Sequence, residues 1–158
     1  MAKKNAKKNS GGFVLLFAMM LSSIVLAITL GIATISSREI KFGTDAVKTN
    51  QALFAADTGA ECALYNDKTT SNVFVGSGGN ATIECMGNNF SVSQSFSTWS
   101  FVVSGLGSNA QGCAKILVDK SVANTVTVTS KGYNDGGSQL GSCNPSADSV
   151  ERVLQLNY

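Results

Sequence analysis

Side chains that commonly perform catalysis are sparse in this chain of 158 residues. The chain has no histidine, so it lacks the most frequent general base. Asp57 and Glu61 lie four residues apart on one predicted helix face, a pattern more typical of a solvated face than of two cooperating carboxylates. The glycine-rich stretches 76–79 and 105–107 lack the Lys-Ser or Lys-Thr of a phosphate loop. We therefore expect no enzymatic activity, no catalytic residues and no cofactor.

Four cysteines are spread widely along the chain, at Cys62, Cys85, Cys113 and Cys143. Their spacing contains no CxxC pair and argues against a metal site. An even number in a small polar region indicates two disulfides and an oxidising, extracytoplasmic compartment, with four buried free thiols as the alternative. Among the three possible connectivities we favour pairing of sequence neighbours, Cys62 with Cys85 and Cys113 with Cys143.

An uncharged apolar segment runs from Phe13 to Ile35. As a helix its 23 residues would extend roughly 35 Å, enough to cross a hydrocarbon core of about 30 Å. The segment is longer than the apolar region of a cleavable secretory signal. The charged residues that precede this segment are four lysines: Lys3, Lys4, Lys7 and Lys8. Because positive flanks stay in the cytoplasm, we expect a single-pass membrane segment with a cytoplasmic amino terminus.

The helical pattern continues beyond the apolar segment as an amphipathic stretch over residues 36–66. Ile40, Val47 and Phe54 recur every seven residues and form an apolar row. The sole proline, Pro145, lies far downstream. We therefore predict one helix of some fifty residues whose first half is wholly apolar.

Residues 67–158 have the composition of a β-rich domain, with short apolar runs separated by Gly, Ser and Asn. The predicted strands are Asn72–Val75, Ala81–Cys85, Phe90–Phe96, Trp99–Ser104, Ala114–Lys120, Thr125–Thr129 and Val150–Tyr158. Such runs favour an antiparallel sheet whose apolar face the helix from Ile40 to Tyr65 would cover. The predicted fold class is α+β.

The net charge of +2 comes from the amino-terminal tail. Beyond residue 12 the chain carries 8 basic and 10 acidic side chains. Because this part has no basic excess, we expect no direct binding of nucleic acid.

The junction Ser10-Gly11-Gly12-Phe13-Val14-Leu15-Leu16, after a lysine-rich tail, resembles the class III signal of type IV prepilins and pseudopilins. The resemblance implies a leader at residues 1–12, cleavage between Gly12 and Phe13 by prepilin peptidase, and N-methylation of Phe13. It also implies the pilin-like arrangement of a long helix on a sheet. The stretch from Ala52 to Tyr65 resembles the helix end of PilX-type minor pilins.

One position departs from the pattern of major pilins, which often have Glu at the fifth mature residue. That position here is Phe17, which favours a minor pilin or pseudopilin. The resemblance implies other pilin subunits, prepilin peptidase, the assembly machinery and, before assembly, the lipid bilayer as partners. The protein would pass from the inner or cytoplasmic membrane to a cell-surface pilus. The alternative is a permanently anchored single-pass protein with an extracellular binding domain.

Overall fold

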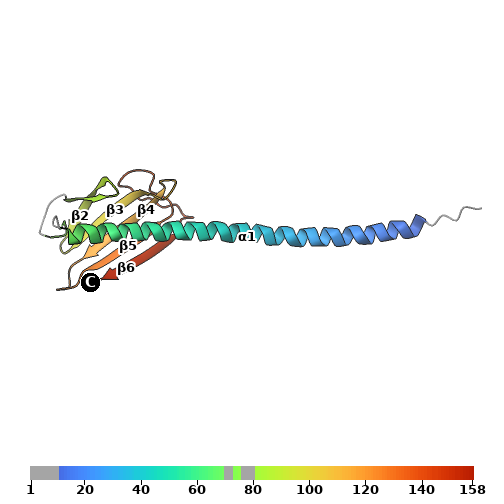
Figure 1. Ribbon diagram of the computed structural model, residues 1–158, viewed down its shortest axis with the longest axis horizontal. Helices are drawn as coiled ribbons and strands as arrows, with labels where there is room; N and C mark the ends of the chain where they lie inside the picture. The colour runs from blue at the N-terminus through green and yellow to red at the C-terminus, as the bar shows by residue number, and fades with distance from the viewer. Residues whose placement is uncertain (1–10, 70–72, 76–80) are drawn as a thin grey trace, which may run out of the picture. The chain divides into compact units, whose positions relative to one another are not determined.

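The structure, a computed structural model, describes residues 11–69, 73–75 and 81–158. These residues form one helix and one six-stranded sheet (Figure 1). The elements are α1 (Gly11–Lys68), β1 (Ala81–Cys85), β2 (Asn88–Ser95), β3 (Thr98–Leu106), β4 (Gly112–Asp119), β5 (Thr127–Tyr133) and β6 (Glu151–Asn157). This confirms the predicted α+β class, in which a long amino-terminal helix is followed in the sequence by an antiparallel sheet.

Helix α1 runs without interruption for 58 residues. Its residues belong to two compact units, one ending at Thr44 and one from Asp45 to Tyr158. The first unit contains the apolar segment, and the second contains the rest of α1 together with the sheet. We refer to the second unit as the head. The leader lysines, from Lys3 to Lys8, lie outside the described residues.

The sheet is an antiparallel meander in which each strand pairs with its neighbour in sequence. Two-residue turns join β1 to β2 at Met86-Gly87 and β2 to β3 at Phe96-Ser97. Both residues of the first turn have positive φ, 52° and 74°, as the twist of a tight hairpin requires. All pairings are therefore local, and the order of the strands follows the order of the sequence.

Small side chains bring α1 close to the sheet. Five alanines of the head portion of α1 are buried: Ala52, Ala55, Ala56, Ala60 and Ala63. Opposite them, a Cβ added at Gly132 of β5 would lie 2.2 Å from the Ala52 carbonyl oxygen and the Ala56 nitrogen. A Cβ at Gly59 would lie 2.6 Å from the Ser130 hydroxyl. Any larger residue at these places would force the helix away from the sheet.

The core lies between this alanine face and the inward side chains of the strands. Trp99, Phe101, Val103, Ile116 and Val118 are buried, as their alternation in the sequence predicts. Leu154 and Leu156 of β6 are half-buried. The head therefore has one main apolar core, to which the helix contributes mostly small residues.

Two sequence predictions are wrong in their details. The row Ile40, Val47 and Phe54 is exposed, at 68%, 55% and 67%. Within the head, α1 faces β5 with small side chains instead, because its backbone lies too close to Gly132 for larger ones. The part of the predicted strand Asn72–Val75 that the structure describes is a turn. This turn places Phe74 in the core, with its ring centroid 6.2 Å from that of Trp99. Phe74 is thus buried without pairing in the sheet.

Candidate assembly helix and processing site

The predicted processing junction lies at the start of α1. The helix begins at Gly11, so Gly12 and Phe13 are its second and third residues. Apart from its chain neighbours and the backbone of its own helix turn, an added Cβ at Gly12 would meet no described atom within 4 Å, and the Phe13 side chain is 79% exposed. No packing of the described residues therefore hinders access to this peptide bond.

The segment after the junction has the length and composition of a membrane span. It lies in the one described helix that is long and apolar enough to cross a bilayer, with a mean hydropathy of 2.6 in its most apolar window. None of that window is buried within the protein. A core helix of a soluble protein would hide such a surface, so the exposed apolar side chains are compatible with a single-pass membrane segment.

The few polar side chains in this segment satisfy their hydrogen bonds within the helix. Ser22, Ser23 and Thr29 donate to the carbonyl oxygens of Met19, Met20 and Leu26 at 3.0, 2.8 and 2.9 Å. Thr34 donates to the carbonyl oxygen of Gly31 at 2.8 Å. An unpaired hydroxyl in hydrocarbon would cost several kcal/mol. These four hydroxyls therefore add little to the free energy needed to place the segment in an apolar environment.

No carboxylate interrupts the apolar segment. Phe17 is 56% exposed on this surface. An aromatic side chain can enter an apolar helix bundle without a counter-ion, whereas an unpaired carboxylate there would be costly.

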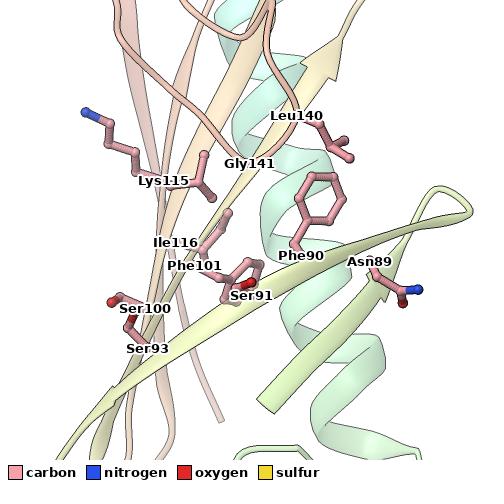
Figure 2. A pocket seen from close by; sticks show the side chains of 11 residues that line it. Asn89, Phe90, Ser91, Ser93, Ser100, Phe101, Lys115, Ile116, Leu140 and Gly141 are labelled. Atoms are coloured by element: carbon pink, nitrogen blue, oxygen red, sulfur yellow. The ribbon is translucent and has the colours of Figure 1, made fainter. Parts of the chain in front are cut away.

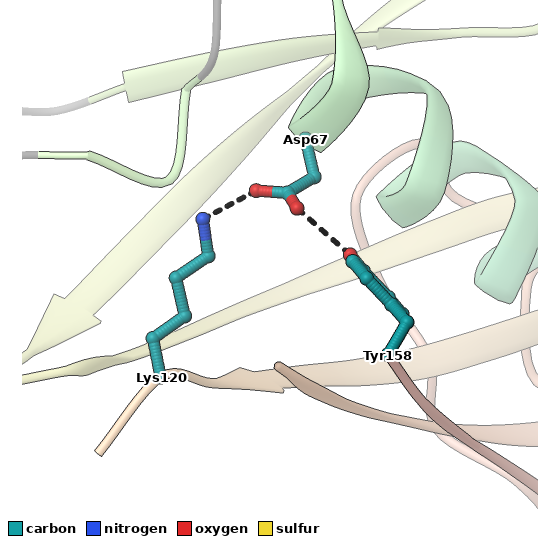
Figure 3. A network of polar contacts seen from close by, with 3 residues as sticks. All are labelled: Asp67, Lys120 and Tyr158. Atoms are coloured by element: carbon teal, nitrogen blue, oxygen red, sulfur yellow. Dashed lines mark hydrogen bonds and ion pairs between the residues drawn. The ribbon is translucent and has the colours of Figure 1, made fainter. Parts of the chain in front are cut away.

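A buried carboxylate connects three distant parts of the head (Figure 3). Asp67, near the end of α1, is 7% exposed. It forms an ion pair with Lys120, which follows β4, and accepts a hydrogen bond of 2.8 Å from the hydroxyl of Tyr158, which follows β6. The ammonium of Lys68 lies 4.3 Å from the centroid of the Tyr158 ring. The network fixes the end of the helix to both the middle and the last strand of the sheet.

Sequence reasoning did not find this network. The spacings of its members, 53 residues from Asp67 to Lys120 and 91 to Tyr158, follow no helix or strand period. Only the folded meander brings its partners together.

Two tyrosine hydroxyls of the head have raised pKa values. The Tyr133 hydroxyl donates a hydrogen bond of 2.6 Å to Glu151. Burial and this hydrogen bond raise the pKa of Tyr133 to about 12. Burial and the hydrogen bond to Asp67 raise the pKa of Tyr158. Both hydroxyls therefore remain protonated donors well above neutral pH and act as structural contacts.

Two disulfides staple the head, and the favoured pairing is confirmed. Cys62–Cys85 joins α1 to the end of β1. Cys113–Cys143 joins the start of β4 to the segment between β5 and β6. The described residues contain no free cysteine. Covalent links thus complement the Asp67 network in holding the helix and the long β5–β6 connection on the sheet.

Asp57 and Glu61 are both exposed on α1. Among the described residues no group of three or more His, Cys, Asp or Glu side chains could hold a metal ion. Cleavage at Gly12 and methylation of Phe13 stay predictions.

Comparison of the chain with protein-family models, curated proteins and solved structures finds no match.

Proposed function

We propose that this protein is a minor pilin or pseudopilin, a non-enzymatic subunit of a type IV pilus-like filament. The observation that carries the proposal is the uncharged helix that starts directly at the Gly12–Phe13 junction and has no buried side chain in its most apolar window. Before assembly this helix would lie in the bilayer, and after assembly it would pack against the equivalent helices of other subunits.

The position of the junction gives the proposed cleavage a physical purpose. A cut between Gly12 and Phe13 removes the four leader lysines, which hold the amino terminus on the cytoplasmic side. The apolar helix remains whole. Without the charged leader, the subunit can leave the bilayer as the filament takes it up, since no lysine side chain must cross the hydrocarbon core.

The disulfides of the head are those expected of a domain in an oxidising compartment outside the cytoplasm, which supports the proposal. Two disulfides and the Asp67 network fix the second part of α1 to the sheet. A subunit that is pulled by its helix must transmit force to its sheet, and these links join the part of α1 within the head to the sheet. Phe17 favours a minor rather than a major subunit.

The alternative is a permanently anchored protein with an extracellular binding domain. Substitution of Gly12 separates the two functions. We expect Gly12→Val to block removal of the leader and to keep the protein in the membrane, so that filaments sheared from the cells lack it. Gly43→Val is the matched control, because Gly43 lies outside the apolar segment and, as at Gly12, an added Cβ would meet no packed neighbour within 4 Å.

The control variant should be processed and recovered in the sheared filaments. If the parent chain never appears in that fraction, or if Gly12→Val appears there as abundantly as the parent, the filament proposal is wrong. Retention of the parent with its leader would favour the permanent anchor.

A further inference from the structure

The sheet has three places where a strand lacks a neighbouring strand on one side. They are the outer edge of β1, the split between the first half of β2 and the second half of β3, and the outer edge of β6. Such an edge presents backbone N–H and C=O groups that can pair with a further strand. In the described part of the chain, other segments lie against the first two places, whereas nothing pairs with the third.

Helix α1 lies against the edge of β1. The side-chain amide of Asn66 donates a hydrogen bond of 3.1 Å to the Glu84 backbone carbonyl on this edge. The disulfide Cys62–Cys85 holds the same end of β1 against the helix. The helix therefore occupies the place beside the end of β1 where a further strand would pair.

The β5–β6 connection lies against the split between β2 and β3. The register of these strands extends from their turn only to Val92↔Phe101, although both strands continue beyond this point. Along the end of β3, the Gly105 amide donates to the Gly137 carbonyl at 3.0 Å. Figure 2 shows Gly141 of the same connection beside the surface recess of about 620 Å³ that remains there. The connection therefore lies where a strand pairing with the end of β3 would run.

The last strand, β6, has an edge of a different kind (Figure 1). Just beyond it, Val126 and Tyr158 exchange two backbone hydrogen bonds, of 2.8 and 3.1 Å. Residues of an antiparallel ladder alternate between hydrogen-bonded and non-hydrogen-bonded pairs. In the register of β5 with β6, Leu154 and Leu156 therefore also direct their backbone groups toward β5.

The alternate residues of β6 direct their backbone groups away from the sheet. They are Glu151, Val153, Gln155 and Asn157, and the side chains of all four are exposed. Among the described residues, no hydrogen bond reaches these outward backbone groups. The strand also lacks the usual protection of an edge, since it contains no proline, lysine or bulge. It therefore offers a regular row of donors and acceptors to a further strand.

Apolar side chains accompany this edge on the side that faces α1. Leu154 and Leu156 are only half-buried there. Arg152 donates a hydrogen bond of 3.4 Å to the Thr49 hydroxyl, so this side of the helix runs beside β6. Leu53, one turn further along the same side, is 43% exposed. A strand added to β6 would cover these leucines and gain the free energy of their burial.

Arg152 gives this side of β6 an unpaired positive charge. No described carboxylate forms an ion pair with it. The side chains of β6 that share its face are Leu154 and Leu156, so the strand has no acid on this face. A second copy that paired through its own β6 would therefore bring no carboxylate to Arg152. A different strand with an acidic residue at this position would complement the charge.

We propose that the outer edge of β6 binds an extended segment of another protein, which joins the sheet as an additional antiparallel strand. This segment has the pattern apolar-x-apolar-x-acidic, because alternate residues of a strand share one face. Its apolar side chains lie opposite Leu156 and Leu154, and its carboxylate lies opposite Arg152. The inference does not depend on filament assembly, since β6 lies within the head.

The test measures binding of the fluorescently labelled peptide acetyl-Thr-Val-Thr-Val-Thr-Glu-Thr-amide to the full-length protein in detergent micelles, by fluorescence anisotropy with empty micelles as the blank. With its Glu opposite Arg152, the third and fifth residues of the peptide direct their N–H groups to Gln155 and Val153. N-methylation of these two residues should weaken binding by at least about tenfold, because it removes two ladder hydrogen bonds. N-methylation of the second and fourth residues is the matched control. It should leave the dissociation constant within about twofold, because those N–H groups point away from β6.

A pair of protein variants tests the same backbone from the other side. Gln155→Pro removes an outward N–H that does not pair with β5, so the head should stay folded, as the fluorescence of Trp99 would report. Gln155→Ala removes the same side chain and keeps the N–H. We expect Gln155→Pro to weaken binding by at least about tenfold and Gln155→Ala to leave it within about twofold.

Amide hydrogen exchange, followed by NMR, locates the contact. In the free protein the amides of Val153, Gln155 and Asn157 should exchange faster than those of Leu154 and Leu156, and the peptide should slow them. Absence of binding, equal weakening by the two N-methylated peptides, or unchanged exchange at the outward amides would overturn the proposal. Equal binding of a peptide with Lys in place of its Glu would also overturn it. A dimer of the parent protein that Gln155→Pro dissociates would overturn it in favour of a second copy.

Discussion

At the scale of single residues, the head depends on one buried carboxylate. Asp67 is 7% exposed and satisfies both of its oxygens, one with Lys120 and the other with the Tyr158 hydroxyl. Lys120 also lies 5.8 Å from the centroid of the Trp99 ring, so the charge pair borders the aromatic core. Removal of one partner would leave the other buried and without compensation.

Substitution of Asp67 tests this dependence. We expect Asp67→Asn to lower the free energy of unfolding by about 2–4 kcal/mol, since the partly buried Lys120 loses its counter-ion. Urea unfolding followed by the fluorescence of Trp99, the only tryptophan, gives the value. Lys131→Gln breaks the exposed pair with Glu151 and should cost less than about 1 kcal/mol. Equal effects of the two variants would show that the Asp67 network does not stabilise the head.

At the scale of elements, α1 and β5 lie close together because both have small residues where they meet. The helix presents alanines and Gly59, and the strand presents Gly132. The apolar row that the heptad spacing suggested lies on the exposed surface instead. A hydrophobic period identifies an apolar face of a helix, but it does not reveal how close the neighbouring backbone will approach.

A single methyl group tests the close approach. Gly132→Ala places a Cβ against the backbone of α1, where neither side can yield as a flexible side chain would. We expect a loss of about 1–3 kcal/mol in the free energy of unfolding, measured by the same urea titration. Gly43→Ala adds the same methyl group to open space on α1, outside the head, and should leave the head's stability unchanged. A neutral effect of Gly132→Ala would mean that the helix does not pack this tightly.

The exposed apolar row has a use in the proposed filament. Phe54 is 67% exposed, so Phe54→Ala should change the stability of the head by less than about 0.5 kcal/mol. If neighbouring subunits cover this row, the same variant should be depleted from sheared filaments relative to the parent. A Phe54→Ala variant that unfolds the head would contradict the observed exposure, and full incorporation would exclude Phe54 from the subunit contacts.

At the scale of the whole molecule, the broad architecture was predictable from the sequence. The long helix followed from the uncharged segment and the absence of proline before Pro145. Six of the seven predicted strands are present: Ala81–Cys85 has the predicted ends, and the other five have shifted ends. The exception, at residues 73–75, is a turn that buries Phe74. The preferred disulfide pairing followed from proximity in sequence, which the meander preserves.

The parts that were not predictable depend on contacts between distant segments. Strand order, the Asp67 network and the divergence of β2 from β3 leave no periodic signal in one sequence. The apolar helix and its junction are local features, which is why they could be predicted from the sequence.

The central claim is that the helix is freed for assembly by a cut at its first apolar residue. Mass spectrometry of the amino terminus of the protein, purified from the cells that make it, tests this most directly. We predict that the mature chain begins at Phe13 and that its terminal amine carries a methyl group. A mature protein that retains the lysine leader would contradict the account.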